Sequence, residues 1–149
     1  MLNRNQSRYL YKAKRIDGGE WVQGYYVKGS YMYGKETHVI FEPDAIFYSH
    51  GETDCLAEID PSTICQCTGL KDKNGKLIWE NDIVEAWSQG SKATGKVRQR
   101  IDGLWFMYPA WQKREFWGLC PNNDRETTVE VIGNIFDNPE LLDGKVNYD

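Results

Sequence analysis

Enzymes that use a side-chain nucleophile usually place it beside a histidine base, which a third group orients. The chain has two histidines, His38 and His50. Thr37 precedes the first and Ser49 precedes the second, but residues adjacent in sequence are not aligned for catalysis. Both histidines fall in predicted loops or at strand edges, where we expect surface side chains with ordinary partners. We therefore assign no catalytic residue and do not expect an enzyme.

A run of carboxylates suggests a second kind of chemistry, the binding of a divalent metal. Magnesium-dependent nucleases need several carboxylates that converge on one point. Four carboxylates lie close together in sequence: Asp72, Glu80, Asp82 and Glu85. Asp72, however, falls in a predicted hairpin loop, and Asp82 is placed to cap the corner before Ile83 by accepting a backbone hydrogen bond. We expect structural roles for these groups and no metal site.

The four cysteines do not follow a zinc-binding pattern. Zinc modules usually show two knuckles of the C-x₂₋₄-C or H-x₃₋₅-H type. This chain has one C-x-C pair, Cys65 and Cys67, with Cys55 and Cys120 separate from it. If residues 64–68 form a strand, Cys65 and Cys67 point to one face and are small core residues. We predict free thiols in a reducing compartment, and no cofactor.

Basic side chains alternate along one segment. Lys96, Arg98 and Arg100 are spaced two residues apart, so on a strand they project to one side. Cations near aromatic rings are typical of surfaces that stack nucleic-acid bases, and three tryptophans follow: Trp105, Trp111 and Trp117. The alternative is a solvated outer face of a sheet. The formal net charge of −4 and the sequence pI near 5.2 favour that alternative, because nucleic-acid binders usually carry a positive excess.

The segment 25–33 (YYVKGSYMY) is rich in aromatic rings. Its tyrosines are Tyr25, Tyr26, Tyr31 and Tyr33. Surplus rings can form an exposed patch that binds a partner or a second copy of the chain. A β-rich chain with many strand edges commonly protects them by assembly. We therefore predict a partner patch at these four tyrosines.

Composition indicates a soluble β protein. The 149 residues (17.3 kDa) suffice for one ordinary domain or two very small lobes. The aromatic share of 13% and the fourteen glycines favour β-structure, in which rings cover pleated faces and glycines make turns. The N-terminal residues lack the apolar core of a signal peptide, and no run approaches a membrane-spanning length. We expect a cytoplasmic protein.

Period-two alternation predicts strands along most of the chain. The expected strands are 9–15, 21–27, 38–41, 57–59, 64–68, 82–87, 95–101, 104–108 and 127–136, with a turn at 89–92. Gly24, Gly29 and Gly34 are spaced as turns and not as a phosphate-binding loop. Asp60 and Asn138 each precede a proline and are expected to cap one helical turn. A longer helix is left open only at 111–119.

The segment Thr68–Val84 (TGLKDKNGKLIWENDIV) carries the strongest local signals. Asn74 and Gly75 predict a hairpin turn, because both residue types tolerate the left-handed backbone of such turns. The segment then reaches Asp82 and an apolar strand.

Several segments resemble a known family, the YopX-like proteins of phages and prophages. They are 14–25 (KRIDGGEWVQGY), 59–64 (IDPSTI), 68–76 (TGLKDKNGK), 80–84 (ENDIV) and 130–142. The structural signature of the resemblance includes Gly69, Asn74, Gly75 and Asp82. Asn81 replaces a glycine that members more often carry, and asparagine is the next-best residue for a left-handed backbone.

The resemblance implies a mainly β fold of antiparallel sheets, a phage or prophage gene and a cytoplasmic product. It supplies no catalytic residues to transfer. The run 82–108 is also typical of an SH3-like or other small barrel, by analogy. We predict a single YopX-like domain over 1–149, with sub-lobes 1–67 and 68–142 and a tail at 143–149.

Three classes of function stay open. The leading hypothesis is an accessory protein that associates with a host or phage protein or with itself. The alternative is a nucleic-acid-binding β module that uses Lys96, Arg98 and Arg100. An enzyme with an unrecognised site is the third.

Overall fold

The computed structural model describes residues 7–30, 34–42, 56–88, 90–108 and 116–143. Within these ranges the chain is mainly β, which confirms the predicted fold class, and the helical segments are short 3-10 turns. The chain divides into two compact units, residues 1–67 and 68–149, with the boundary where the sequence placed its two sub-lobes. In the described ranges, no helix has the length and apolar character needed to cross a membrane.

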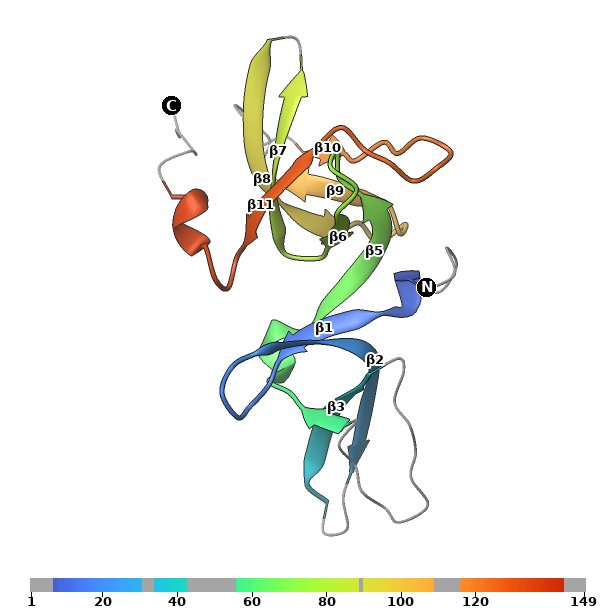
Figure 1. Ribbon diagram of the computed structural model, residues 1–149, viewed down its shortest axis with the longest axis vertical. Coiled ribbons are helices and arrows are strands. Elements are labelled where there is room, and N and C mark those ends of the chain that lie inside the picture. The colour runs from blue at the N-terminus through green and yellow to red at the C-terminus, as the bar shows by residue number, and fades with distance from the viewer. Residues whose placement is uncertain (1–6, 31–33, 43–55, 89, 109–115, 144–149) are drawn as a thin grey trace. The chain divides into compact units, whose positions relative to one another are not determined.

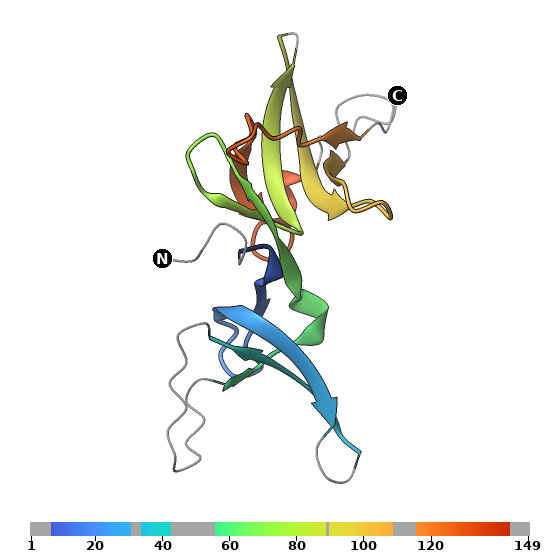
Figure 2. The same ribbon diagram turned by 90° about the vertical axis from the view of Figure 1, so that its right-hand side faces the viewer.

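Unit 1 is built from antiparallel strands (Figure 1). They are β1 (Tyr11–Lys14), β2 (Trp21–Ser30), β3 (Glu36–Phe41), β4 (Leu56–Glu58) and the first part of β5 (Cys65–Lys71), in the order β4-β3-β2-β1-β5. The 3-10 turn η1 (Ser7–Tyr9) precedes β1, and η2 (Pro61–Thr63) follows β4. Figure 2 shows the curvature of the long strand β2.

The sheet of unit 1 curls until the chain after β4 meets the end of β1. Arg15, just after β1, forms an antiparallel bridge with Ile59, just after β4. The Ile16 N–H donates to the Glu58 carbonyl (3.1 Å), and the Asp60 N–H donates to the Lys14 carbonyl (2.9 Å). The curl encloses a small apolar core: Ala13, Val22, Ile40, Ala57 and Ile59. The sequence predicted barrel-like closure for the C-terminal lobe, not for this unit.

Gly24 permits a close approach between two strands. Both Gly24 and Gly29 lie inside β2 and not in turns, so the prediction for these two glycines was wrong. A Cβ atom at position 24 would lie 1.8 Å from the carbonyl oxygen of Phe41 in β3. The curl therefore requires a residue without a side chain at this point.

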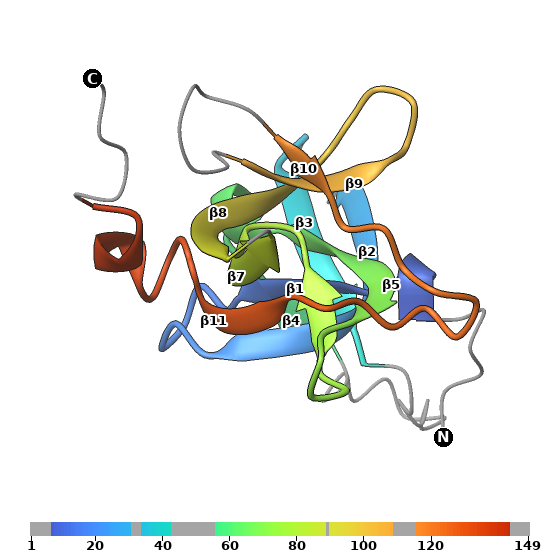
Figure 3. The same cartoon turned by 90° about the horizontal axis from the view of Figure 1, so that it is seen from above.

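Unit 2 contains a five-stranded antiparallel sheet and a hairpin that packs on it. The sheet has the order β10-β9-β8-β7-β11, with β7 (Asp82–Ser88), β8 (Ser91–Gln99), β9 (Trp105–Tyr108), β10 (Trp117–Gly118) and β11 (Glu130–Asn134). The second part of β5 pairs with β6 (Leu77–Trp79). Figure 3 shows β10 beside β9 and the 3-10 turn η3 (Pro139–Leu141) after β11. SH3-like closure of this unit stays a prediction.

The core of unit 2 lies on one face of this sheet. Its buried residues are Ile78, Val84, Ala86, Ala93, Val97, Met107, Leu119 and Val129. Alternate residues of β7, β8 and β9 supply most of them, as the period-two pattern requires. Ile78 comes from β6, so the β5–β6 hairpin covers this face.

Most observed strands differ from the predicted ones by a few residues at an end, and β6 was not predicted; two of the differences have structural consequences. β8 begins at Ser91, inside the expected turn at 89–92. β11 spans only 130–134 of the expected 127–136, because Asn134 Oδ1 accepts the N–H groups of Phe136 (3.0 Å) and Asp137 (2.9 Å) and turns the chain. Within 111–119, where a helix was left open, residues 111–115 lie outside the described ranges and 117–118 form β10.

The two predicted helix caps have different outcomes. Asp60 caps η2 as predicted, since its carboxylate accepts the Ser62 N–H at 3.0 Å. Asn138 makes no capping hydrogen bond in η3. Its Oδ1 instead accepts the Asn134 N–H at 3.3 Å, so that prediction was wrong.

Candidate functional site

The signature residues of unit 2 bind backbone. Asp82 is 2% exposed, and its Oδ2 accepts the Trp79 N–H at 2.8 Å. This confirms its predicted role as the cap of a corner. Asn81, the residue before it, has a φ of 68°, so the left-handed corner is formed. Gly69 also has a positive φ (75°), although it lies inside β5.

Asp72 has a larger structural role than a hairpin-loop position predicts. It is 2% exposed, and its Oδ1 accepts the N–H groups of Asn74 and Lys76, both at 2.9 Å. Its Oδ2 accepts the N–H of Val131 in β11 at 3.1 Å. One buried carboxylate thus shapes the hairpin and joins it to a strand that is distant in sequence.

The hairpin turn itself differs from the predicted geometry. Gly75 has a left-handed backbone (φ 82°), but Asn74 is not among the residues with positive φ. The Gly75 N–H donates to the Asp72 carbonyl at 3.0 Å, and the Asp72 N–H donates to the Lys76 carbonyl at 2.7 Å. The turn therefore spans Asp72 to Lys76 with its one left-handed residue at Gly75.

The carboxylates of the signature do not converge. In the described ranges, no group of three or more His, Cys, Asp and Glu side chains is arranged to hold a metal ion. Cys65 and Cys67 are 1% and 0% exposed, which confirms them as small core residues. Cys120 is an exposed free thiol, and Cys55 lies outside the described residues.

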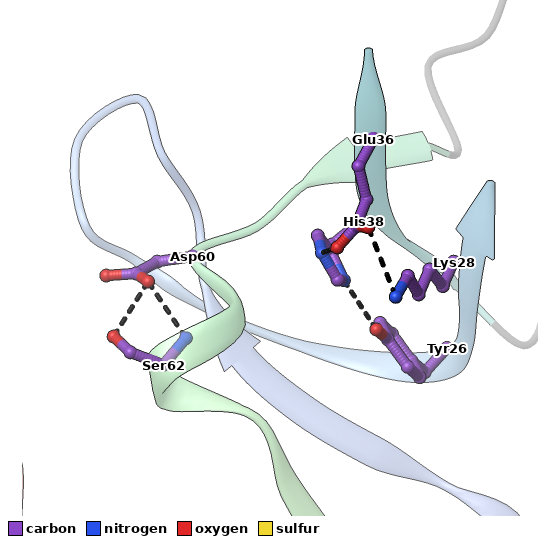
Figure 4. A network of polar contacts seen from close by, with 6 residues as sticks. All are labelled: Tyr26, Lys28, Glu36, His38, Asp60 and Ser62. Atoms are coloured by element: carbon purple, nitrogen blue, oxygen red, sulfur yellow. Dashed lines mark hydrogen bonds and ion pairs between the residues drawn. The ribbon is translucent and has the colours of Figure 1, made fainter. Parts of the chain in front are cut away.

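A connected polar network in unit 1 was not predicted from the sequence. Figure 4 shows four side chains of β2 and β3 joined in a row. Tyr26 Oη contacts His38 Nδ1 at 2.5 Å, and His38 Nε2 contacts Glu36 Oε1 at 2.9 Å. The second carboxylate oxygen of Glu36 lies 3.2 Å from Lys28 Nζ. Hydrogen bonds from Lys28 and His38 hold the pKa of Glu36 below its usual value.

The two contacts favour one tautomer of a neutral His38 ring. If Nε2–H donates to the Glu36 carboxylate, Nδ1 has a lone pair that accepts the Tyr26 hydroxyl proton. The His38 side chain is 16% exposed, and its ring stacks on that of Tyr26, with centroids 5.9 Å apart. His38 is therefore half-buried and not a surface side chain, so that part of the prediction was wrong, whereas the ordinary partners that were predicted are present. His50 lies outside the described residues.

The sequence held one signal for this network. Glu36 and His38 are two residues apart, so on one strand they share a face. The register pairs Lys28 directly with His38, and no local pattern could have shown that. Figure 4 also shows the Asp60 cap, where hydrogen bonds from the side chain and N–H of Ser62 lower the pKa of the Asp60 carboxylate.

The predicted tyrosine patch does not form one surface. Tyr25 is 39% exposed on the outer face of the curled sheet. Tyr26 points to the opposite face, where it packs against the apolar core with Tyr11. Consecutive residues of a strand point to opposite sides, so these two tyrosines cannot share a flat patch. Tyr31 and Tyr33 lie outside the described residues.

The outer face of unit 1 carries a set of apolar side chains on three strands. The register places Tyr25 opposite Phe41 and Phe41 opposite Leu56. In the neighbouring row Val27 lies opposite Val39. Tyr25 and Val27 (44% exposed) are exposed, and the other three are half-buried. These five residues are called the apolar face below.

Two members of the predicted cation stripe, Lys96 and Arg98, lie on one side of β8. Lys96 is half-buried, whereas Arg98 and Arg100 are exposed. β8 ends at Gln99, so Arg100 lies just past it, and Arg100 forms an ion pair with Asp102 at 3.3 Å. Two of the tryptophans expected beside the stripe, Trp105 and Trp117, pack against the core instead. Trp111 lies outside the described residues.

The comparison with known families covers both units. Residues 13–143 match the family model described as YopX protein. No curated protein sequence matches the chain.

Proposed function

Because the chain belongs to the YopX protein family, we propose that it is a phage or prophage accessory protein that binds another protein in the bacterial cytoplasm. The apolar face of unit 1 carries this proposal. When a sheet buries rows of apolar side chains against a partner protein, the interface is packed like the interior of a single protein.

The spacing of the apolar face supports protein contact. Tyr25, Phe41 and Leu56 form one row, and directly opposed residues of neighbouring strands have Cβ atoms about 5 Å apart. Val27 and Val39 form the next row. The two rows present these apolar side chains to a partner, and the exposed Glu58 lies opposite Val39 at the β4 end of the second row.

Cationic side chains lie along the same side of the sheet. Trp21 and Lys14 face each other across β2 and β1, and the ammonium groups of Lys12 and Lys14 lie 4.8 and 5.4 Å from the Trp21 ring centroid. A surface that combines an apolar centre with a cationic rim suits a partner with apolar side chains and flanking acidic groups.

The proposal does not assign catalysis. The carboxylate oxygens of Asp72 and Asp82 accept backbone N–H groups. His38 uses both ring nitrogens in contacts within its own sheet. These groups are accounted for by structural roles, and we propose that the chain is not an enzyme.

The test combines affinity capture with light scattering. The variant Tyr25→Ser/Val27→Thr removes the exposed members of the apolar face, and Tyr9→Ser removes a tyrosine that is 58% exposed elsewhere in unit 1. We expect one identified host or phage protein, or a second copy of the chain, to bind the unmodified protein and Tyr9→Ser. The double variant should lose at least tenfold in affinity, because exposed aromatic anchors dominate such contacts. A monomer at all concentrations with no partner lost on substitution would overturn the proposal.

A further inference from the structure

The side of the five-stranded sheet opposite the core of unit 2 combines cations with aromatic rings. Lys96 lies opposite Tyr108, and Arg98 lies opposite Phe106, in the β8–β9 register. Val97 and Met107, the residues between them, point into the core. The two cations and two rings therefore form two adjacent rows on one face of the sheet.

A second pair of contacts extends this surface. The rings of Phe106 and Phe116 meet edge to face, with centroids 5.2 Å apart. The guanidinium of Arg100 lies 5.3 Å from the Phe116 ring centroid. Phe116 is 49% exposed, so its ring is open to further stacking. We call Lys96, Arg98, Arg100, Phe106, Tyr108 and Phe116 the cationic face.

The acidic groups near this surface are paired. Glu85 binds Lys92 at 2.7 Å, and Glu130 binds Lys73 at 2.9 Å. Lys96 and Arg98, by contrast, have no ion-pair partner among the residues that the structure describes. The local charge is therefore positive although the formal net charge of the whole chain is −4.

We infer that the cationic face binds single-stranded nucleic acid. Cations two residues apart on a strand are about 6.8 Å apart, and they can follow a sugar–phosphate backbone. The exposed ring of Phe116 offers a surface for an unstacked base, and the half-buried rings of Phe106 and Tyr108 flank the cations. A duplex keeps its bases stacked, so it would use the cations alone. Two cations, with Arg100 already paired to Asp102, provide little affinity on an acidic protein without the rings.

This inference uses a surface of unit 2 and does not depend on the apolar face of unit 1. Binding is measured by fluorescence anisotropy with labelled dT15 and rU15 at about 25 mM salt, against a 15-base-pair duplex of the same label. We expect both single strands to bind more tightly than the duplex. The ratio between dT15 and rU15 identifies which sugar the face prefers.

Two pairs of variants locate the site. Lys96→Gln/Arg98→Gln removes two cations of the face, and Lys71→Gln/Lys76→Gln removes the same charge from exposed positions on the β5–β6 hairpin. The first should lower the slope of log K against log salt by about 1.4, because each contact with a single strand contributes about 0.7. The second should leave the slope unchanged.

The ring contribution is tested by Phe116→Ala. We expect about a tenfold loss of affinity for dT15, the size of one lost stacking contact, at an unchanged salt slope. The matched control is Ile101→Ala, at an exposed apolar residue. Circular dichroism spectra verify that each variant is folded, and any variant that is not folded is replaced by Phe116→Leu or by Arg98→Gln alone.

Four results would overturn the inference. They are the absence of salt-sensitive binding at 25 mM salt, equal affinity for duplex and single strand, equal loss in both double variants, and full affinity in folded Phe116→Ala. None of these results bears on the light-scattering and capture measurements, so the two proposals fail separately.

Discussion

β2 and β3 approach each other closely at Gly24. We therefore predict that a glycine-to-alanine substitution lowers the free energy of unfolding at position 24 and raises it at position 29. Gly24→Ala and Gly29→Ala both add a single methyl group to β2. At position 24 the new Cβ would lie 1.8 Å from the Phe41 carbonyl oxygen, 2.6 Å from its carbon and 3.0 Å from Ile40 Cγ2. At position 29 nothing lies within 4 Å.

The magnitude follows from the backbone that must move. Phe41 and Ile40 pair with Tyr25 and Tyr26 in the β2–β3 ladder. A retreat of about 1 Å stretches those hydrogen bonds beyond their working range of about 3.2 Å. Loss of two ladder bonds at about 1 kcal/mol each, with about 2 kcal/mol of overpacking, gives a destabilisation of about 4 kcal/mol for Gly24→Ala. Gly29→Ala should instead stabilise by about 0.5 kcal/mol, because it restricts the unfolded chain.

Urea unfolding followed by circular dichroism measures the two free energies of unfolding. Hydrogen exchange then localises the effect, with peptides from β2 and β3 compared to peptides from β7 and β8 as an internal reference. We expect faster exchange in β2 and β3 for Gly24→Ala only. The close approach would be refuted if the free energy of unfolding of Gly24→Ala lay within about 0.5 kcal/mol of that of the unmodified chain, or if both variants were equally destabilised.

Three further predictions concern named side chains. Asp72→Asn should destabilise by about 2 kcal/mol in urea, because an amide N–H would face the Val131 N–H; normal exchange at that amide would contradict this. Asn81→Gly should leave the free energy of unfolding within about 0.5 kcal/mol, whereas Asn81→Ala should lower it by about 1 kcal/mol, and equal values would refute the left-handed corner. The lowered pKa of Glu36 contributes stability above the usual glutamate pKa that is lost as the pH falls through the lowered value. Glu36→Gln should therefore flatten the acid limb of a pH–stability curve, and an unchanged limb would exclude that contribution.

Several local side-chain contacts were predictable from the sequence, although the cap expected at Asn138 is not formed. Asp60 accepts a hydrogen bond from an N–H two residues away, and Asp82 accepts one from three residues away. Asn81 takes the left-handed backbone that its residue type tolerates. In each of these positions, the residue and its immediate neighbours carry all the information that determines the geometry.

Contacts between distant segments were not predictable in the same way. Asp72 reaches Val131, 59 residues away, and no residue near it indicates that partner. The row from Tyr26 to Glu36 depends on the β2–β3 register. A shift of that register by one residue would turn each side chain to the other face. Period-two patterns assign residues to a face, but they do not determine which strand lies opposite.

For the cation stripe, the alternating pattern predicted the face of the strand correctly but not the neighbouring rings. Alternation placed Lys96 and Arg98 on one side of a strand, and the structure does the same. Proximity in sequence then suggested Trp105 and Trp117 as neighbouring rings, but odd-numbered residues of β9 and β10 face the core. The rings beside the cations are those of the even-numbered residues Phe106 and Tyr108, which lie opposite Arg98 and Lys96. Strand parity was therefore more informative than sequence distance.

The chemistry of the signature segment also indicates where binding can occur. Asp72 and Asp82 are each 2% exposed and bind backbone N–H groups, so a ligand that took these oxygens would leave buried donors without partners. Such exchange is unfavourable, because an unsatisfied buried N–H costs about 1–3 kcal/mol. Exposed side chains such as Tyr25 and Arg98 can contact a ligand without leaving a buried N–H group unpaired. Substitutions in the signature should therefore change folding stability first, and substitutions on the apolar and cationic faces should change binding at nearly constant stability.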